Sequence, residues 1–379
     1  MMRILAVGLR LLAAIFQLFP VRRRVALLSR QSQTPSADFR LLAARLREDD
    51  PTLTVKISCT ASELSGKLQF ALHMLEHLWL ARTSRVVVLD GYNPTVCIPA
   101  KRKRVFVIQL WHAAGAIKKF GFQCLDTPAG RSSKQAEVAC MHKNYDLIVA
   151  AGQGAVASYA EAFGYPPEAV RALGLPHLGQ LLGRMADQVA IEGLRAAHPW
   201  LSNGNLNVVY APTLRRDADA SWLTEAVTQL ARALEAAPVN LIVSKHPLTT
   251  IDDQALTRHE RVHVLSNRTT AGLLPIADVL ISDYSAIALE AGLAGVPALF
   301  YMPDVAQYRV SPGLNIDPVA NPLLFGTESA DDIAAALIDD ARLASIAADY
   351  RSFIHSYFAG TDPSDSIVDL VSLIEEHLG

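Results

Sequence analysis

Four short polar segments of this chain each follow an apolar run that is typical of a buried strand. They are Trp111-His112, Thr213-Leu214-Arg215, Ser244-Lys245-His246 and Ser282-Asp283-Tyr284-Ser285. Histidine suits proton transfer near neutral pH, and arginine and lysine bind phosphate oxygens. Ligands of parallel α/β sheets bind at the carboxyl ends of strands, so the four segments together predict a site for a phosphate-bearing substrate.

The Asp283–Ser285 turn opens a helical pattern that leads through Glu290 to a further strand at Ala298–Tyr301. Free backbone N–H groups and the helix dipole at such a start favour a phosphate group. Glu290 follows at a spacing that suits acceptance from ribose hydroxyls, so the pattern favours a nucleotide diphosphate site. The alternative is that Asp283 or Ser285 only caps the helix and that Glu290 is a solvated surface residue.

Each of the other segments also has a structural interpretation. A lone histidine such as His112 is more often satisfied by backbone than catalytic, and Arg215 could form a surface ion pair. Lys118 and Lys119 could hold phosphate or form a solvated face, and Gly115 lies in a small-residue turn that lets a substrate approach. The combination carries the prediction, because all four segments fall at expected strand ends.

Apolar β-type runs alternate with helical patterns along the chain, which predicts parallel sheets and an α/β fold. The expected strands fall in two groups of five, and hence in two doubly wound, Rossmann-like domains facing a cleft. The expected strands are Val25–Ser29, Leu53–Ile57, Val86–Leu89, Val105–Leu110, Leu147–Ala150, Leu206–Tyr210, Asn240–Val243, Val262–Leu265, Val279–Ile281 and Ala298–Tyr301. The expected ranges are a basic, membrane-associating segment at 1–24, domains at 25–198 and 199–345, and helices at 346–379 that pack back on the first domain.

The composition bounds the class of protein. The chain has 379 residues, 51% of them hydrophobic, and a formal net charge of −2, which argues against a general nucleic-acid binder. Its four cysteines lack C-x-x-C spacing, so neither a zinc site nor a disulfide framework is expected. No acidic cluster typical of Mg²⁺ is present, which predicts a reaction without a metal or another cofactor.

The first 37 residues contain no acidic side chain. Arg3, Arg10 and Gln17 recur every seven residues, which places them in one polar stripe of an otherwise apolar helix that ends at Pro20. This pattern predicts an amphipathic helix lying on an anionic membrane surface, with the following arginines facing head groups. The basic cluster Lys101–Arg104 is expected to face lipid head groups or an anionic acceptor. A core-packed first helix and a signal peptide are the alternatives.

In their order and combination, the polar motifs resemble those of the CDP-glycerol glycerophosphotransferases, which build teichoic acids and related wall or capsule polymers. The motifs are Gln109–Gly121, Tyr210–Arg215, Lys245–Pro247, Ser282–Ser285 and Leu299–Tyr301. The resemblance covers about residues 20 to 330. It implies a GT-B-type fold and transfer of glycerol phosphate, or a related polyol phosphate, from the CDP-linked donor to a lipid-linked saccharide or polyol-phosphate acceptor. It also implies peripheral attachment to the cytoplasmic face of the membrane, and it leaves a homo-oligomer open.

The resemblance also assigns roles to individual residues. His112 matches the base toward the acceptor hydroxyl, and His246 matches a histidine near the donor pyrophosphate. The expected donor side comprises Arg215, Lys245, Asp283, Tyr284, Ser285 and Glu290, and the expected acceptor side comprises Gly115, Lys118 and Lys119. The stretch Ala113–Ala116 departs from the family's usual Gly-Thr-Pro-Leu, which bears on the acceptor.

The implied reaction is attack of an acceptor hydroxyl on the β-phosphorus of CDP-glycerol, with release of CMP. The main alternative is a GT-B glycosyltransferase that uses a nucleotide sugar, because the fold does not fix the chemistry. A non-catalytic membrane scaffold and a sugar epimerase are further alternatives. Release of CMP, rather than UDP or GDP, separates the first two.

Overall fold

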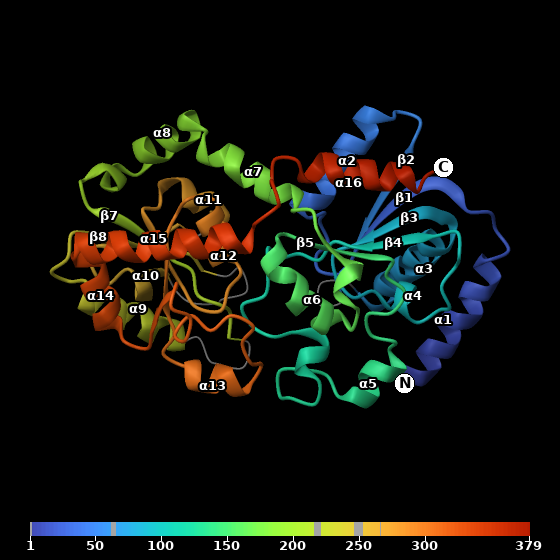
Figure 1. Cartoon of the computed structure of the whole chain (residues 1–379), viewed down its shortest axis with the longest axis horizontal. Helices are drawn as coiled ribbons and strands as arrows, with labels where there is room; N and C mark the ends of the chain where they lie inside the picture. The colour runs from blue at the N-terminus through green and yellow to red at the C-terminus, as the bar shows by residue number, and fades with distance from the viewer. Residues whose placement is uncertain (1, 62–65, 216–220, 246–252, 266) are drawn as a thin grey trace. The chain divides into compact units, whose positions relative to one another are not determined.

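The computed structural model describes residues 2–61, 66–215, 221–245, 253–265 and 267–379. The chain divides into two compact units (Figure 1). The first comprises residues 1–114, 119–179 and 360–379, and the second comprises residues 115–118 and 180–359. The sequence predicts domain boundaries after residues 198 and 345 instead, and these boundaries stay predictions.

The first unit is built on a six-stranded parallel sheet in the order β2-β1-β3-β4-β5-β6. Its strands are β1 (Arg22–Ser29), β2 (Thr54–Cys59), β3 (Ser84–Leu89), β4 (Phe106–Gln109), β5 (Leu147–Ala150) and β6 (Val170–Ala172). Central strands such as β3 and β5 are apolar runs with nearly every side chain buried, as expected for strands covered on both faces.

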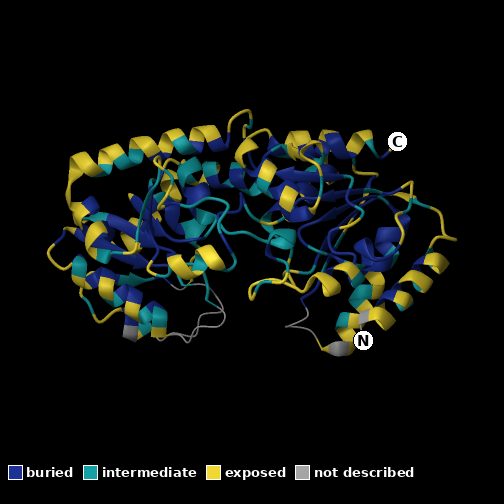
Figure 2. Ribbon diagram, turned by 60° about the horizontal axis from the view of Figure 1, so that its bottom comes forward, coloured by how far each residue is buried: buried dark blue, intermediate teal, exposed yellow. Residues whose placement is uncertain are grey.

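The second unit repeats this architecture, with the strand order β12-β11-β10-β7-β8-β9. Its strands are β7 (Leu206–Tyr210), β8 (Val239–Val243), β9 (Val262–Val264), β10 (Val279–Ser282), β11 (Ala298–Tyr301) and β12 (Phe325–Thr327). In both units, buried strands lie beneath helices whose outer faces are exposed (Figure 2). The predicted α/β class with two doubly wound sheets is confirmed.

The expectation of five strands in each sheet was wrong by one strand per sheet. The missing strands are β6 and β12, each of which is a three-residue strand at one edge of its sheet. Neither is a buried apolar run, because β6 buries only Val170 and β12 has no fully buried side chain. Their residues therefore lack the pattern by which a buried strand is recognised.

Helices connect the strands in both units. In the first half of the chain they are α1 (Met2–Phe16), α2 (Ala37–Asp49), α3 (Lys67–Thr83), α4 (Pro94–Cys97), α5 (Ser133–Val138), α6 (Val156–Phe163) and α7 (Pro176–Met185). The later helices are α8 (Gln188–Ala197), α9 (Ser221–Ala233), α10 (Asp253–Leu256), α11 (Thr270–Leu273), α12 (Ile287–Leu293), α13 (Val305–Val310), α14 (Ala330–Ile338), α15 (Asp340–Tyr357) and α16 (Ser366–Glu376). Helix α16 belongs to the first unit, where it packs on α2.

The N-terminal helix α1 is present, and it packs on α3 through two alanines and a leucine. Ala6, Leu9 and Ala13 are buried in a cluster with Leu78. Most of the large apolar side chains of α1 are instead exposed to solvent: Ile4, Leu5, Val7, Leu11 and Ile15. No described helix combines the length and the apolar character needed to cross a bilayer.

The arginines after α1 have separate environments. Arg24 is buried on β1 and donates to the hydroxyl groups of Thr83 and Ser84, so the expectation that it faces head groups was wrong. Arg23 is exposed and pairs with Asp50. A side chain on a paired strand has a fixed side of the sheet, and this position of β1 points Arg24 inward.

Candidate functional site

His112 lies three residues beyond the end of β4, as predicted from the motif. Its Nδ1 lies 2.9 Å from the carbonyl oxygen of Asp90, at the end of β3. A ring that donates from Nδ1 keeps the lone pair of Nε2 for a proton from another group. The residue is exposed, yet the surrounding protein lowers the pKa of its imidazole, while the hydrogen bond to Asp90 opposes that change.

Gln109 holds the turn that carries His112. It is fully buried, and its Nε2 donates to the carbonyl oxygen of Gly91 at 3.1 Å. Its Oε1 accepts from the backbone N–H of Trp111 at 3.0 Å. Trp111 has a φ of 60°, a conformation that costs energy for a residue with a side chain and that needs such support.

Asp90 adds a buried carboxyl group beside His112. The residue is 3% exposed, and its Oδ1 has no hydrogen-bond partner among the described residues. Burial raises the pKa of Asp90 to about 7, while a hydrogen bond with Ser29 opposes the rise. Sequence reasoning missed Asp90, and it included Gln109 in a motif without giving it a role. A polar residue inside or directly after a buried apolar strand is a signal that could have found them.

The three expected acceptor-side residues lie in different surroundings. Gly115 and Lys118 belong to a four-residue stretch of the second unit, whereas Lys119 belongs to the first unit and is partly buried. A Cβ atom at Gly115 would collide with the hydroxyl group of Tyr357 and with Leu289. Lys118 pairs through its backbone with Leu314. Close packing therefore explains the glycine at 115.

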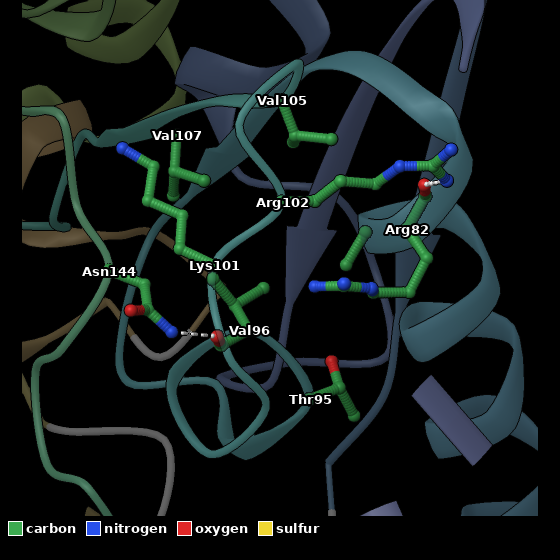
Figure 3. A pocket seen from close by; sticks show the side chains of 9 residues that line it. Arg82, Thr95, Val96, Lys101, Arg102, Val105, Val107 and Asn144 are labelled. Carbon is green, nitrogen blue, oxygen red and sulfur yellow. Dashed lines mark hydrogen bonds between the residues drawn. The ribbon is translucent and has the colours of Figure 1, made fainter. Parts of the chain in front are cut away.

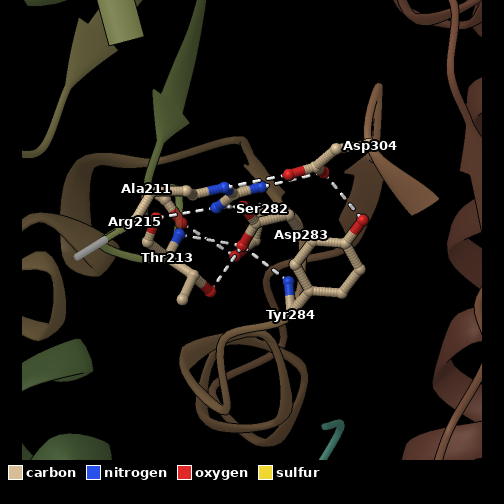
Figure 4. Close-up of polar contacts among 7 residues, drawn as sticks. All are labelled: Ala211, Thr213, Arg215, Ser282, Asp283, Tyr284 and Asp304. Carbon is tan, nitrogen blue, oxygen red and sulfur yellow. Dashed lines mark hydrogen bonds and ion pairs between the residues drawn. The ribbon is translucent and has the colours of Figure 1, made fainter. Parts of the chain in front are cut away.

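In the second unit, Arg215 lies between two carboxylates (Figure 4). Its Nε and Nη2 donate to Asp304 at 3.1 and 3.0 Å, and its Nη1 donates to Asp283 at 2.5 Å. The guanidinium also lies over the Trp222 ring at 4.5 Å. Burial would lower the pKa of Arg215, but Asp283, Tyr308 and Asp304 raise it above its ordinary value.

Asp283 organises the loop ends around Arg215. Its carboxylate accepts from the N–H and hydroxyl groups of Thr213, at 2.8 and 2.7 Å, and from the N–H of Tyr284, besides the bond from Arg215. The hydroxyl group of Tyr284 donates to Asp304 at 2.9 Å. Burial raises the pKa of Tyr284, and Asp304 adds to the rise. The structure thus brings together Arg215, Asp283 and Tyr284, and it adds Asp304, which sequence reasoning missed.

The remaining donor-side residues lie on the same unit. Ser285 precedes α12, and its hydroxyl group lies 3.4 Å from the N–H of Ile287, while Glu290 is partly buried in the first turn of the helix. Lys245 follows β8 and pairs with Asp253. His246 lies outside the described residues. His112, in contrast, belongs to the first unit.

The comparisons with known proteins point to one family. The family model for CDP-Glycerol:Poly(glycerophosphate) glycerophosphotransferase matches residues 11–373. A teichoic acid ribitol-phosphate primase of Bacillus spizizenii is 30% identical over 77% of this chain and 76% of the relative. A teichoic acid glycerol-phosphate primase of Bacillus subtilis is 25% identical over 64% of this chain and 62% of the relative. The match to a teichoic acid poly(ribitol-phosphate) polymerase of Bacillus spizizenii covers 47% of the length of that relative.

Two solved structures support the fold. The wall teichoic acid polymerase TagF has a TM-score of 0.73 at 16% identity, covering 98% of this chain and 94% of that chain. A UDP-GlcNAc 2-epimerase of Neisseria meningitidis has a TM-score of 0.62 at 12% identity, covering 93% and 99%. With the family model spanning nearly the whole sequence, the chain belongs to the CDP-glycerol:poly(glycerophosphate) glycerophosphotransferase family, as its motifs predicted.

Proposed function

We propose that this enzyme transfers glycerol phosphate or ribitol phosphate from its CDP-linked form to a hydroxyl group of a membrane-linked teichoic acid precursor. Family membership supports the polyol-phosphate transfer. The observation that carries the proposal is the contact of His112 Nδ1 with the Asp90 carbonyl oxygen, because it leaves Nε2 as a base. The proposal includes both donors because one relative is a ribitol-phosphate primase and another is a glycerol-phosphate primase.

In the proposed reaction, His112 Nε2 takes the proton of the acceptor hydroxyl while its oxygen attacks the β-phosphorus. The new P–O bond forms as the bond to the CMP phosphate breaks, and CMP leaves with the bonding electrons. Lys245 and His246 are proposed to neutralise the phosphate oxygens, and Ser285 is proposed to donate a hydrogen bond to them, since positioning and charge stabilisation carry most of such transfers. The reaction is proposed to need no resident cofactor.

The contacts of Arg215 and Asp283 refine their proposed roles. Both side chains are engaged with each other and with Asp304 or Thr213. We therefore propose that they set the shape of the donor loops, with Tyr284, instead of lying against phosphate oxygens. Glu290 stays the candidate for the ribose hydroxyls, and Gly115, Lys118 and Lys119 stay candidates for the acceptor side.

We also propose peripheral attachment to the cytoplasmic face of the membrane through α1 and α3. Ile4, Leu11 and Ile15 on α1 are 78%, 63% and 52% exposed, and Leu68 and Leu72 on α3 are 76% and 58% exposed. Two packed helices with exposed apolar side chains are suited to the boundary between head groups and acyl chains.

The test of the reaction is CMP release by the purified chain from CDP-glycerol and, separately, from CDP-ribitol, with a lipid-linked disaccharide acceptor. Wild type is compared with His112→Ala and His246→Ala, each with and without EDTA. Release that both substitutions abolish and that EDTA leaves intact supports the proposal. Release of UDP from a nucleotide sugar, with none from either CDP-polyol, would instead favour the glycosyltransferase alternative.

The test of attachment is fractionation of the double variant Leu11→Gln and Ile15→Gln. It should move from the membrane fraction to the soluble fraction, while retaining CMP release with a detergent-dispersed acceptor. Val189→Gln is the matched control, because Val189 is 81% exposed on α8 of the second unit. Equal membrane fractions for the double variant and the control would refute the attachment.

A further inference from the structure

A small basic pocket lies in the first unit, between the end of α3 and the start of β4 (Figure 3). Its volume is about 20 Å³, which is room for one water-sized group. Three cations line it, namely Arg82, Arg102 and Lys101, and Lys101 is paired with Asp146. Thr95, Val96 and Asn144 form much of the remaining wall. Val105 and Val107 line it at the start of β4, whereas His112 follows the other end of that strand, so the pocket is separate from the proposed base.

Arg82 is a buried cation with unused donors. The residue is 4% exposed, and its Nη1 donates to the carbonyl oxygen of Ala100 at 2.8 Å. Its Nε and Nη2 are buried and have no hydrogen-bond partner among the described residues. A buried charge without compensation is costly, so these two groups call for a ligand with acceptor atoms.

Arg102 adds a second positive charge beside Arg82, which makes an anionic ligand more favourable. Arg102 donates through Nη1 to the carbonyl oxygen of Arg82 at 2.5 Å and through Nη2 to that of Phe19 at 2.8 Å. Both arginines thus bond only neutral oxygens among the contacts of the described chain, while the Asp146 carboxylate nearby is taken by Lys101. Burial lowers the pKa of Arg82, and the adjacent charge of Arg102 lowers it further.

The position of the pocket indicates the source of the anion. Arg102 contacts the backbone of Phe19, just beyond α1, and the Phe19 ring packs edge-on against Trp79 of α3 at 4.8 Å. Leu18 and Phe19 are 83% and 44% exposed. Arg102 therefore adjoins the exposed apolar residues that follow α1. A phosphate held between Arg102 and Arg82 would lie beside these residues, as a lipid phosphate does when apolar side chains enter the acyl boundary.

We propose that Arg82 and Arg102 bind the phosphate group of an anionic membrane phospholipid, with one phosphate oxygen inside the pocket against Nε and Nη2 of Arg82. The lipid source rests on the membrane attachment proposed above. The inference that the ligand is a phosphate does not rest on that attachment, because it follows from the Nε and Nη2 groups of Arg82, which have no partner among the described residues. The apolar side chains would hold the enzyme on the membrane, and the bound phosphate would fix its orientation there.

The first experiment detects the anion at Arg82 itself. The full chain, labelled with ¹⁵N-arginine, is titrated with inorganic phosphate and, separately, with monomeric dihexanoyl phosphatidylglycerol. The Nε–H signal that disappears in Arg82→Met identifies the residue. The proposal expects that signal to shift and saturate with both probes. No shift with either probe would overturn the pocket as an anion site.

The second experiment measures co-sedimentation with vesicles of phosphatidylcholine, with and without phosphatidylglycerol. Arg82→Met and Arg102→Met should each weaken binding to the anionic vesicles by about tenfold or more, as for loss of hydrogen bonds to a charged group. Lys103→Gln, an exposed neighbour, should weaken it by about fivefold, the effect of any one basic residue near an anionic surface. Equal losses in all three variants would overturn a specific site.

The two experiments separate the possible failures. If wild type binds no vesicles but the Arg82 signal shifts with inorganic phosphate, the pocket binds soluble phosphate, and its lipid source and the membrane attachment are both overturned. Arg82→Lys keeps the charge and checks folding, since its thermal unfolding should match that of wild type. CMP release with a detergent-dispersed acceptor should be unchanged in every pocket variant, which keeps this test independent of the proposed reaction.

Discussion

His112 Nδ1 lies 2.9 Å from the carbonyl oxygen of Asp90. A backbone carbonyl accepts but never donates, so this contact selects the imidazole tautomer that carries its proton on Nδ1. The carbonyl also has a fixed place at the end of β3, and it orients the ring. The backbone at the end of β3 thereby sets both the tautomer and the orientation of His112, which follows the neighbouring strand β4.

His112→Ala should lower the rate of CMP release by about 10²- to 10⁴-fold, the usual contribution of a positioned base. A base acts in its neutral form, so wild-type rates should fall as the pH drops through the pKa of His112. Since the surrounding protein lowers that pKa, the fall should lie below the ordinary histidine range. The pH profile of kcat/KM measures it, and an unchanged acidic limb in the variant would contradict the assignment.

Gln109→Ala should misplace His112 without removing it. Loss of the bonds to Gly91 and Trp111 frees the strained turn, so kcat should fall by about 10²-fold, as for a misplacement on the order of 1 Å. KM for the CDP-linked donor should change little, because Gln109 lies in the first unit. Steady-state kinetics measure both constants. Gln135→Ala, at an exposed position on α5, is the control, and equal kcat values in the two variants would refute the positioning role.

Arg215→Met should destabilise the second unit by about 3–5 kcal/mol, the usual cost of leaving a buried partner charge alone. The side chains of Arg215 and Asp283 are only 10% and 2% exposed. Arg309 and Asp317 form a matched pair whose side chains are 44% and 25% exposed, and Arg309→Met should cost about 1 kcal/mol or less. Urea unfolding of both variants makes the comparison, and similar losses would contradict a buried network.

Gly115→Ala should destabilise the chain by about 1–3 kcal/mol through overpacking. The new methyl group meets the Tyr357 hydroxyl group and Leu289. Adding Tyr357→Phe should recover part of this loss, since it removes the atom in closest conflict. Gly193→Ala is the control, because a Cβ atom there meets no atom within 4 Å. Thermal unfolding measures all three, and a double variant no better than Gly115→Ala would show that the conflict lies elsewhere.

Asp90→Asn should change how stability depends on pH. The folded-state pKa of Asp90, about 7, lies above the ordinary value of 3.8, so the native state holds a proton that the unfolded state releases between those values. Wild-type stability should therefore fall relative to the variant as the pH rises from 4 to 7. The expected difference is on the order of a few kcal/mol, because each pKa unit corresponds to about 1.4 kcal/mol. Urea unfolding at pH 4.5 and 7.5 measures it, and a difference that does not grow with pH would contradict the prediction.

The sequence was sufficient to predict most strands, because short apolar runs such as Leu147–Ala150 and Leu206–Tyr210, alternating with helical patterns, are typical of a sheet covered on both faces. It was also sufficient to place His112 and Arg215 beyond strand ends. The edge strands β6 (Val-Arg-Ala) and β12 (Phe-Gly-Thr) were missed because each offers only one large apolar residue in three, whereas the predicted edge strand β9 contains two valines.

The sequence could not give the partners of these residues. Asp304 lies 89 positions after Arg215, and Asp90 lies 22 positions before His112, so both contacts arise from the fold and not from local pattern. An arginine after a strand predicts phosphate binding and an ion pair equally well. Only the positions of the two carboxylates show that the guanidinium is already engaged.

Helix α16 has a consequence for the order of events during synthesis. Its buried residues Leu370 and Ile374 complete the first unit by packing toward α2, yet more than 300 residues separate α2 from α16 along the chain. The N-terminal sheet therefore leaves the ribosome long before the helix that covers it. Until residue 376 has emerged, the apolar surface of α2 stays open to chaperones, whereas the long stretch of the second unit, residues 180–359, is already available to fold.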